Sequence, residues 1–253
     1  MKTISEQYKS IIYDIDLRWL KLDINFDDIT NLREFKSFDN EFSSQNTTGW
    51  SGLSYRGIEL KKVRPYPEYG YKSEDEVPYE WTEMASACPN FKTELDINFP
   101  ECKFYRVKVN KLAPGGKIYP HSDSRKLGLG LTEHSPYSDT NPFKIKYITY
   151  ALDWPDNVDY YVNKRKLPIQ TGDVFLVNFG MVHEVYNLCE KDRVSIIITA
   201  DLEDQEWWQN LVVRSFALNG QHQPGKADKL PLNVRLMAII ALMKQKISYR
   251  LAK

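Results

Sequence analysis

The chain is poor in cysteine and in long apolar stretches. Its 253 residues include only three cysteines, Cys88, Cys102 and Cys189, too few for a paired disulfide framework and not spaced as a metal-binding cluster. We therefore expect a reducing, cytoplasmic location. The longest apolar run, residues 236–243, is far shorter than the roughly 20 residues that span a bilayer. The first residues also lack the apolar region of a signal peptide, so no membrane association is expected.

The chain has no excess of charge of either sign. Lys and Arg together number 34, as do Asp and Glu, so nothing calls for a polyanionic partner and nucleic-acid binding is not expected. Hydrophobic residues make up 42% of the chain, enough to bury a sizeable core.

Short runs of strand-forming residues, separated by Pro, Gly and Asp, dominate the middle of the chain. These runs are residues 104–109, 145–152, 158–162, 174–179 and 193–200. The pattern predicts a mainly β protein with a jelly-roll core. We expect an N-terminal helical and loop extension covering the core (residues 1–100), a catalytic core (101–201) and a C-terminal helical extension (202–253), all in one compact domain.

A set of potential metal ligands stands out among only four histidines. His121 and Asp123 follow a Pro- and Gly-rich segment (112–120) that predicts a turn. In an extended segment, residues two apart point to the same side, so both can face one cavity. His183 follows another predicted strand. Two imidazoles and one carboxylate can hold one face of an octahedral iron(II) and leave the other face open.

A guanidinium begins the most apolar of the predicted strands. Arg193 opens residues 193–200, and a charge at that place requires a partner. Arginine binds carboxylates through two parallel hydrogen bonds, and Ser195 on the same face can add a third. The alternative is a salt bridge to a nearby acid such as Asp192.

Taken together, these motifs resemble the aspartyl/asparaginyl β-hydroxylase-like branch of the iron(II)/2-oxoglutarate dioxygenases, which includes bacterial proline cis-hydroxylases. The resemblance is strongest over residues 100–201. It rests on Arg106-Val107, Lys111-Leu112, Pro114-Gly115, Pro120-His121-x-Asp123, Gly172-Asp173-Val174, His183-x-Val185-x-Asn187 and Asp192-Arg193-x-Ser195.

The resemblance implies a double-stranded β-helix (jelly roll, cupin-like) with flanking α-helices. It also implies iron(II) on His121, Asp123 and His183, with 2-oxoglutarate chelating the metal and its distal carboxylate on Arg193. Ser195, Tyr147 and Thr149 complete the expected 2-oxoglutarate site. Dioxygen would be the third cofactor.

The expected reaction is hydroxylation of an unactivated C–H bond coupled to oxidative decarboxylation of 2-oxoglutarate to succinate. Asp123 argues against halogenation, because related halogenases lack that carboxylate. Residues 147–150 replace basic residues of the animal aspartyl hydroxylases, which does not favour an acidic substrate side chain. We expect a free amino acid or a small derivative. The alternatives are a peptide or protein side chain, and a noncatalytic cupin-like metal-binding protein, which would not need Arg193.

The substrate site is less defined by the sequence. Residues 43–50 and 64–71 have the composition of loops, and they form either a lid with a substrate wall or a surface cover over a sheet edge. Trp50, Arg56, Arg106 and Arg125 are the candidate substrate-binding residues. The insert at residues 128–139 is expected to border the cavity mouth.

The residue pattern of the C-terminal region predicts two helices. Trp207 and Trp208 lie in a segment of near-helical spacing, and packing against the sheet is favoured over capping a pocket. Beyond a polar linker, one apolar stripe follows helical spacing. It consists of Leu236, Ile240, Met243, Ile247 and Leu251. The stripe either packs on its own domain or forms a homodimer seam, with a membrane-surface helix as a third option.

Overall fold

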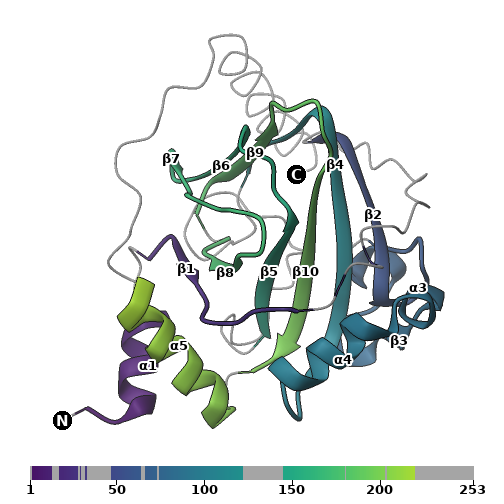
Figure 1. Ribbon diagram of the computed structural model, residues 1–253. Helices are drawn as coiled ribbons and strands as arrows, with labels where there is room; N and C mark the ends of the chain where they lie inside the picture. The colour runs from purple at the N-terminus through teal and green to yellow at the C-terminus, as the bar shows by residue number, and fades with distance from the viewer. Residues whose placement is uncertain are drawn as a thin grey trace, which may run out of the picture.

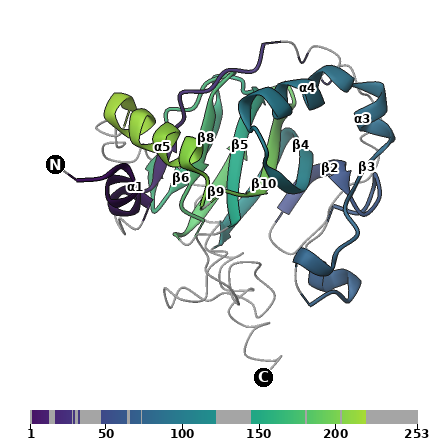
Figure 2. The ribbon, with the colours of Figure 1, turned by 90° about the horizontal axis from the view of Figure 1, so that it is seen from below.

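The computed structural model describes residues 2–12, 17–27, 29, 32, 47–63, 66–72, 74–121, 145–179, 181–202 and 204–219. One curled antiparallel sheet forms its centre, with helices against one face (Figures 1 and 2). Among these residues no helix is long and apolar enough to cross a membrane.

The sheet runs in the order β1-β8-β5-β10-β4-β9-β6-β7, and β2 pairs with β4 and β3. The strands are β1 (Trp19–Lys21), β2 (Thr47–Gly57), β3 (Glu80–Trp81), β4 (Lys103–His121), β5 (Ile145–Asp153), β6 (Val158–Val162), β7 (Arg165–Lys166), β8 (Val174–Val177), β9 (His183–Asn187) and β10 (Arg193–Asp201). The predicted mainly β jelly roll with flanking helices is confirmed. The domain boundaries at residues 100 and 201 stay predictions, although β1, β2 and β3 are part of the sheet.

Strand β4 is longer than the sequence pattern indicates. It pairs with β10 through Lys103–Leu112 and with β9 through Lys117–His121. The predicted turn at residues 112–120 is therefore wrong as a chain reversal. Pro114 precedes Gly115, whose φ of 69° suits glycine, and the segment leads the strand from one part of the sheet to the other.

The predicted loop at residues 43–50 is wrong for its last four residues, which begin β2. Gly49 sits at an irregularity in the pairing of β2 with β4 and has a φ of 64°. A Cβ there would lie 3.2 Å from the Gly116 Cα. The small and polar residues thus mark a bulge in a strand, not a loop.

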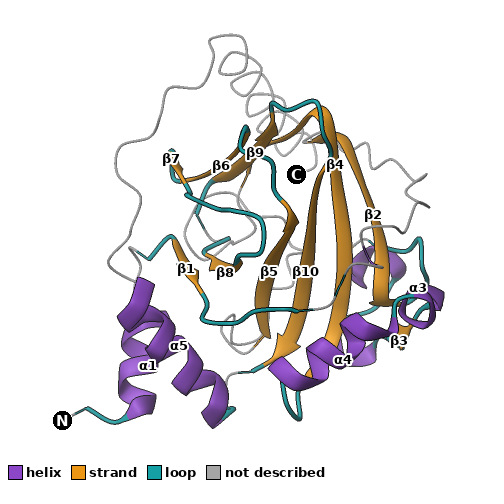
Figure 3. Cartoon of the chain, in the orientation of Figure 1, coloured by secondary structure: helices purple, strands orange, loops and turns teal. Residues whose placement is uncertain are grey.

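Helices cover the face of the sheet on which the larger core cluster lies (Figure 3). They are α1 (Ile4–Ile12), α3 (Glu83–Ala87), α4 (Pro89–Asn98) and α5 (Glu206–Asn219), with short 3-10 turns at Tyr66–Tyr69 and Glu74–Glu76. Helices α1 and α5 are neighbours, and the indole Nε1 of Trp208 donates a hydrogen bond to the Tyr8 hydroxyl at 3.2 Å. Trp208 is fully buried, which confirms packing for this residue. The predicted last helix lies outside the described residues.

We expect Trp208→Ala to lower the free energy of unfolding by about 3–5 kcal/mol, because it leaves a cavity and the Tyr8 hydroxyl loses a donor. Urea denaturation measures this change. Leu218→Ala on the same helix is the control: Leu218 is 59% exposed, and its replacement should change the free energy by no more than about 0.5 kcal/mol. Equal effects of the two substitutions would contradict the packing role of Trp208.

Candidate active site

Strand β10 presents two chemically different faces. Its even-numbered residues from Val194 to Ala200 pack with the larger core under the helices. Successive residues of a strand point to opposite sides, so the odd-numbered ones face the inside of the curled sheet. These are Arg193, Ser195, Ile197 and Thr199. The inner face therefore carries most of the polar groups of a strand that is otherwise apolar.

Strand pairing brings further predicted residues to this inner face. Thr149 lies opposite Ile197, and Tyr147 lies opposite Thr199. Thr149 is buried. The Tyr147 ring lies 6.3 Å from the Phe179 ring, which in turn lies 5.0 Å from the His183 ring. Tyr147 therefore marks the histidine end of the inner face.

His121 and His183 are direct cross-strand partners on β4 and β9. Their ring centroids are 4.2 Å apart. The Nδ1 atom of His121 is 2.7 Å from the Tyr119 carbonyl oxygen, and that of His183 is 3.0 Å from the Met181 carbonyl oxygen. A carbonyl oxygen only accepts hydrogen bonds, so each Nδ1 donates, and Nε2 carries the lone pair of the neutral ring. Backbone-oriented imidazoles of this kind are typical of metal ligands.

The third predicted ligand, Asp123, lies outside the described residues, as do Arg125 and the insert at residues 128–139. Within the described ranges no group of three metal-binding side chains comes together. The structure thus brings together two of the three predicted ligands.

Arg193 is a buried cation, only 4% exposed. Its guanidinium carbon lies 4.4 Å from the centre of the Trp154 ring, and burial lowers its pKa to about 10. Its Nε atom has no hydrogen-bond partner among the described residues. The alternative partner Asp192 pairs instead with Lys111, whose Nζ is 3.7 Å from its carboxylate. A buried guanidinium that no described carboxylate contacts fits a receptor for an anionic ligand.

Two neutral polar groups lie near Arg193 on the same inner face. Ser195 and Asn110 face each other across β10 and β4, and both are 1% exposed. In the described part of the chain neither the Ser195 Oγ nor the Asn110 Oδ1 has a hydrogen-bond partner. The sequence analysis missed Asn110. Its signal was its place two residues before Leu112, the residue opposite Arg193.

A cationic and aromatic pair lies further along the same strands. The Lys108 Nζ lies 4.5 Å from the centre of the Trp50 ring, a cation–π contact. Lys108 is opposite Ile197 on β10, so it shares the inner face. Arg106 lies two residues before it on β4. Lys108 was not predicted, because a lysine within a strand pattern is usually solvated.

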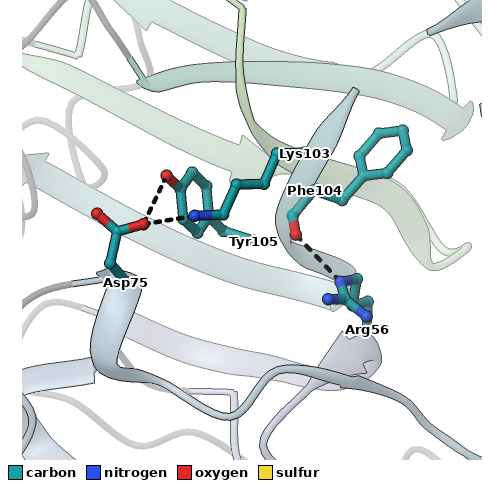
Figure 4. A network of polar contacts seen from close by, with 5 residues as sticks. All are labelled: Arg56, Asp75, Lys103, Phe104 and Tyr105. Atoms are coloured by element: carbon teal, nitrogen blue, oxygen red, sulfur yellow. Dashed lines mark hydrogen bonds and ion pairs between the residues drawn. The ribbon is translucent and has the colours of Figure 1, made fainter. Parts of the chain in front are cut away.

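Arg56 lies at the other end of β2 from Trp50. Its Nε donates to the Phe104 carbonyl oxygen at 3.1 Å (Figure 4), and its guanidinium lies 5.0 Å from the centre of the Trp81 ring. Nearby, the Asp75 carboxylate accepts hydrogen bonds from Lys103 at 2.6 Å and from the Tyr105 hydroxyl at 3.1 Å. The structure does not bring Arg56 next to Trp50, and its substrate role stays a prediction.

A protein-family model described as aspartyl/asparaginyl β-hydroxylase matches residues 19–204. The chain belongs to this family. The match covers most of the sheet and both histidine strands, and it confirms the resemblance and the enzyme class predicted from the motifs. No curated protein matches the chain.

Several solved structures are similar to this member of the hydroxylase family. A 2OG-Fe(II) oxygenase family oxidoreductase from Burkholderia pseudomallei is 11% identical, with 79% of this chain and 91% of that chain covered and a TM-score of 0.40. A viral collagen prolyl hydroxylase from Paramecium Bursaria Chlorella virus-1, in a 2OG complex, is 10% identical, with 73% and 96% covered and a TM-score of 0.41. The epimerase SnoN, in complex with Fe3+ and alpha ketoglutarate, is 8% identical, with 78% and 84% covered and a TM-score of 0.42.

We expect Arg193→Met to raise the free energy of unfolding of the ligand-free hydroxylase by about 1–3 kcal/mol. A methionine of similar length keeps the contact with Trp154 and removes a buried charge that none of the described carboxylates contacts. Chemical denaturation without metal or organic acids measures the change. A clear loss of stability would mean that the guanidinium has a structural partner and is not held for a ligand.

Proposed function

We propose that the protein is an iron(II)- and 2-oxoglutarate-dependent hydroxylase that acts on a free amino acid or a small derivative. One observation supports this assignment above the others. Two imidazoles with their Nδ1 atoms held by backbone carbonyls belong to the interior of one curled sheet, together with a buried guanidinium that has no carboxylate partner among the described residues. Membership of the hydroxylase family supports the same reaction class, hydroxylation. It does not favour a noncatalytic metal-binding protein.

The residues of the candidate site fit both iron(II) and 2-oxoglutarate. His121 and His183, with Asp123, would hold iron(II). Arg193 and Ser195 would bind the distal carboxylate of 2-oxoglutarate, with Thr149 and Tyr147 on the neighbouring strand. When bound, the metal with 2-oxoglutarate and dioxygen supplies an oxidant for an unactivated C–H bond, and 2-oxoglutarate leaves as succinate and carbon dioxide.

The protein's own part is placement and the exclusion of water. The Arg193 guanidinium lies on an indole in an apolar cluster that includes Trp154, Leu112 and Phe175. A carboxylate there would meet a fixed cation and few competing waters, which strengthens the ion pair. The backbone carbonyls of Tyr119 and Met181 orient the two imidazoles before any metal arrives.

We expect His183→Ala to weaken manganese(II) binding, used as a redox-stable substitute for iron(II), by at least about 100-fold and to abolish succinate formation. Calorimetric titration and succinate quantification measure the two effects. Leu188→Ala is the control, because Leu188 is 40% exposed and close in sequence. Full succinate formation by folded, metal-replete His183→Ala protein would overturn the metal assignment.

The charge of the inner face supports a substrate with an anionic group. Arg106 and Lys108 are two residues apart on β4, and the Lys108 ammonium lies over the Trp50 ring. A free amino acid carries its own carboxylate, which these cations suit, whereas a residue inside a peptide lacks it. A peptide side chain stays the alternative. The expected partner is therefore a small molecule, and the cytoplasmic location belongs to the same proposal, supported by three cysteines that form no disulfide.

We expect Trp50→Ala and Lys108→Ala to raise the ratio of succinate to hydroxylated product by about tenfold or more, because a loosely held substrate no longer presents its C–H bond correctly. A screen of amino acids for 2-oxoglutarate turnover would provide the substrate. Lys103→Ala on the same strand is the control, since Lys103 pairs with Asp75 near the surface. Tight coupling in both variants would place the substrate elsewhere, and Arg56→Ala and Arg125→Ala would test the other predicted residues in the same assay.

A further inference from the structure

One buried amide connects three segments of the chain around the candidate site. Asn187 is fully buried. Its Nδ2 donates to the carbonyl oxygens of Leu112 at 2.8 Å, Ala113 at 3.1 Å and Lys191 at 2.8 Å. Its Oδ1 accepts a hydrogen bond from the Cys189 backbone N–H at 3.1 Å. Both polar atoms of the Asn187 side chain therefore form hydrogen bonds to backbone groups.

These three segments carry the histidine pair and Arg193, the two parts of the candidate site. Asn187 is the last residue of β9, the strand that begins with His183. Leu112 on β4 is the residue opposite Arg193 on β10. Cys189 and Lys191 belong to the connection from β9 to β10, which ends two residues after Lys191 at Arg193. The amide thus joins the histidine strand, the partner strand of Arg193 and the link between them.

The ladders of β4 with β9 and with β10 leave a gap at this corner. The pairing of β4 with β9 covers Lys117–His121, and that of β4 with β10 begins at Leu112. Between these two stretches, at residues 113–116, β4 bends, and neither ladder includes those residues. The Asn187 amide bonds to the Leu112 and Ala113 carbonyls at the edge of this gap. These side-chain bonds join β4 to the end of β9 where the two ladders have no pairs. On the other edge of β4, β2 pairs with Lys117 and with Leu112, on either side of the gap.

We propose that Asn187 is a positioning residue that sets the location of Arg193 relative to the imidazole pair, and thereby the affinity for 2-oxoglutarate. This inference rests on the proposed function. It differs from a general stabilising role in one respect. His121 and His183 are fixed by their own pairing and by the carbonyls of Tyr119 and Met181, so loss of the amide should weaken 2-oxoglutarate binding and leave metal binding largely unchanged.

The test compares two dissociation constants in Asn187→Ala and in Asn187→Ser, which keeps one shorter donor. Calorimetry under anaerobic conditions measures manganese(II) binding to the metal-free protein and then 2-oxoglutarate binding to the manganese-loaded protein. We expect the 2-oxoglutarate dissociation constant to rise about 10- to 100-fold in Asn187→Ala, because small displacements of a binding group have effects of this size. Asn187→Ser should be intermediate, and the manganese(II) constant should change less than about threefold.

Ser215→Ala is the matched control. Ser215 is also fully buried, and its Oγ accepts the backbone N–H of Asp23 at 2.9 Å, so it too joins distant segments, but on helix α5. Its loss should lower stability without changing either constant. If the wild type binds neither ligand, the proposed function fails, and the role of Asn187 fails with it.

Three outcomes would overturn the role of Asn187 while the wild type binds both ligands. One is unchanged 2-oxoglutarate affinity in Asn187→Ala. Another is an equal loss of metal and 2-oxoglutarate affinity. The third is unfolding of both Asn187 variants under conditions in which Ser215→Ala stays folded. The last two would show a general structural role.

Discussion

The site depends on the pairing of one bent strand with two partners. Strand β4 pairs with β10 before its bend and with β9 after it, so its backbone hydrogen bonds place Arg193 along the first stretch and His183 beside His121 on the second. Side chains alternate along each strand, and the same register that buries Ile196 and Ile198 under the helices turns Arg193 and Ser195 inward. The apolar core and the polar site are thus two faces of one set of strands.

Inside the curled sheet, none of the described carboxylates neutralises the buried Arg193 guanidinium. Burial lowers the pKa of Arg193 to about 10, and removal of water from a cation costs free energy that a nearby anion would recover. The stacking on Trp154 offsets part of this cost. A fold that accepts such a cost at one place is typical of a binding site, where stability is lost for the benefit of ligand affinity.

Many residues of the candidate site could be predicted from the sequence, because histidine and a strand-initial arginine are uncommon in apolar strands unless they bind something. His121, His183 and Arg193 each follow or begin an apolar run, and the resemblance joined them. Lys108 and Asn110 could not be found this way. Their role depends on which residues of β10 and β2 they face, and this register is fixed by long-range pairing and by bulges.

Local composition failed at two bends for a related reason. Gly49 and the Pro114-Gly115 pair read as turn or loop residues, yet each lies inside a long strand where tertiary pairing overrides local preference. Arg56 was predicted with Trp50 because both lie in the same aromatic and polar zone. A strand separates residues six apart by about 20 Å, and the two side chains have different surroundings.

The central claim is that the imidazole pair and the buried guanidinium form one site for a metal and 2-oxoglutarate. A crystal structure of the protein with manganese(II) and 2-oxoglutarate, grown without oxygen, tests it most directly. We predict an anomalous peak of the metal between the Nε2 atoms of His121 and His183, with Asp123 as the third ligand, and the distal carboxylate of 2-oxoglutarate on Arg193 and Ser195. A metal bound away from the two histidines, or 2-oxoglutarate bound without contact to Arg193, would contradict the account.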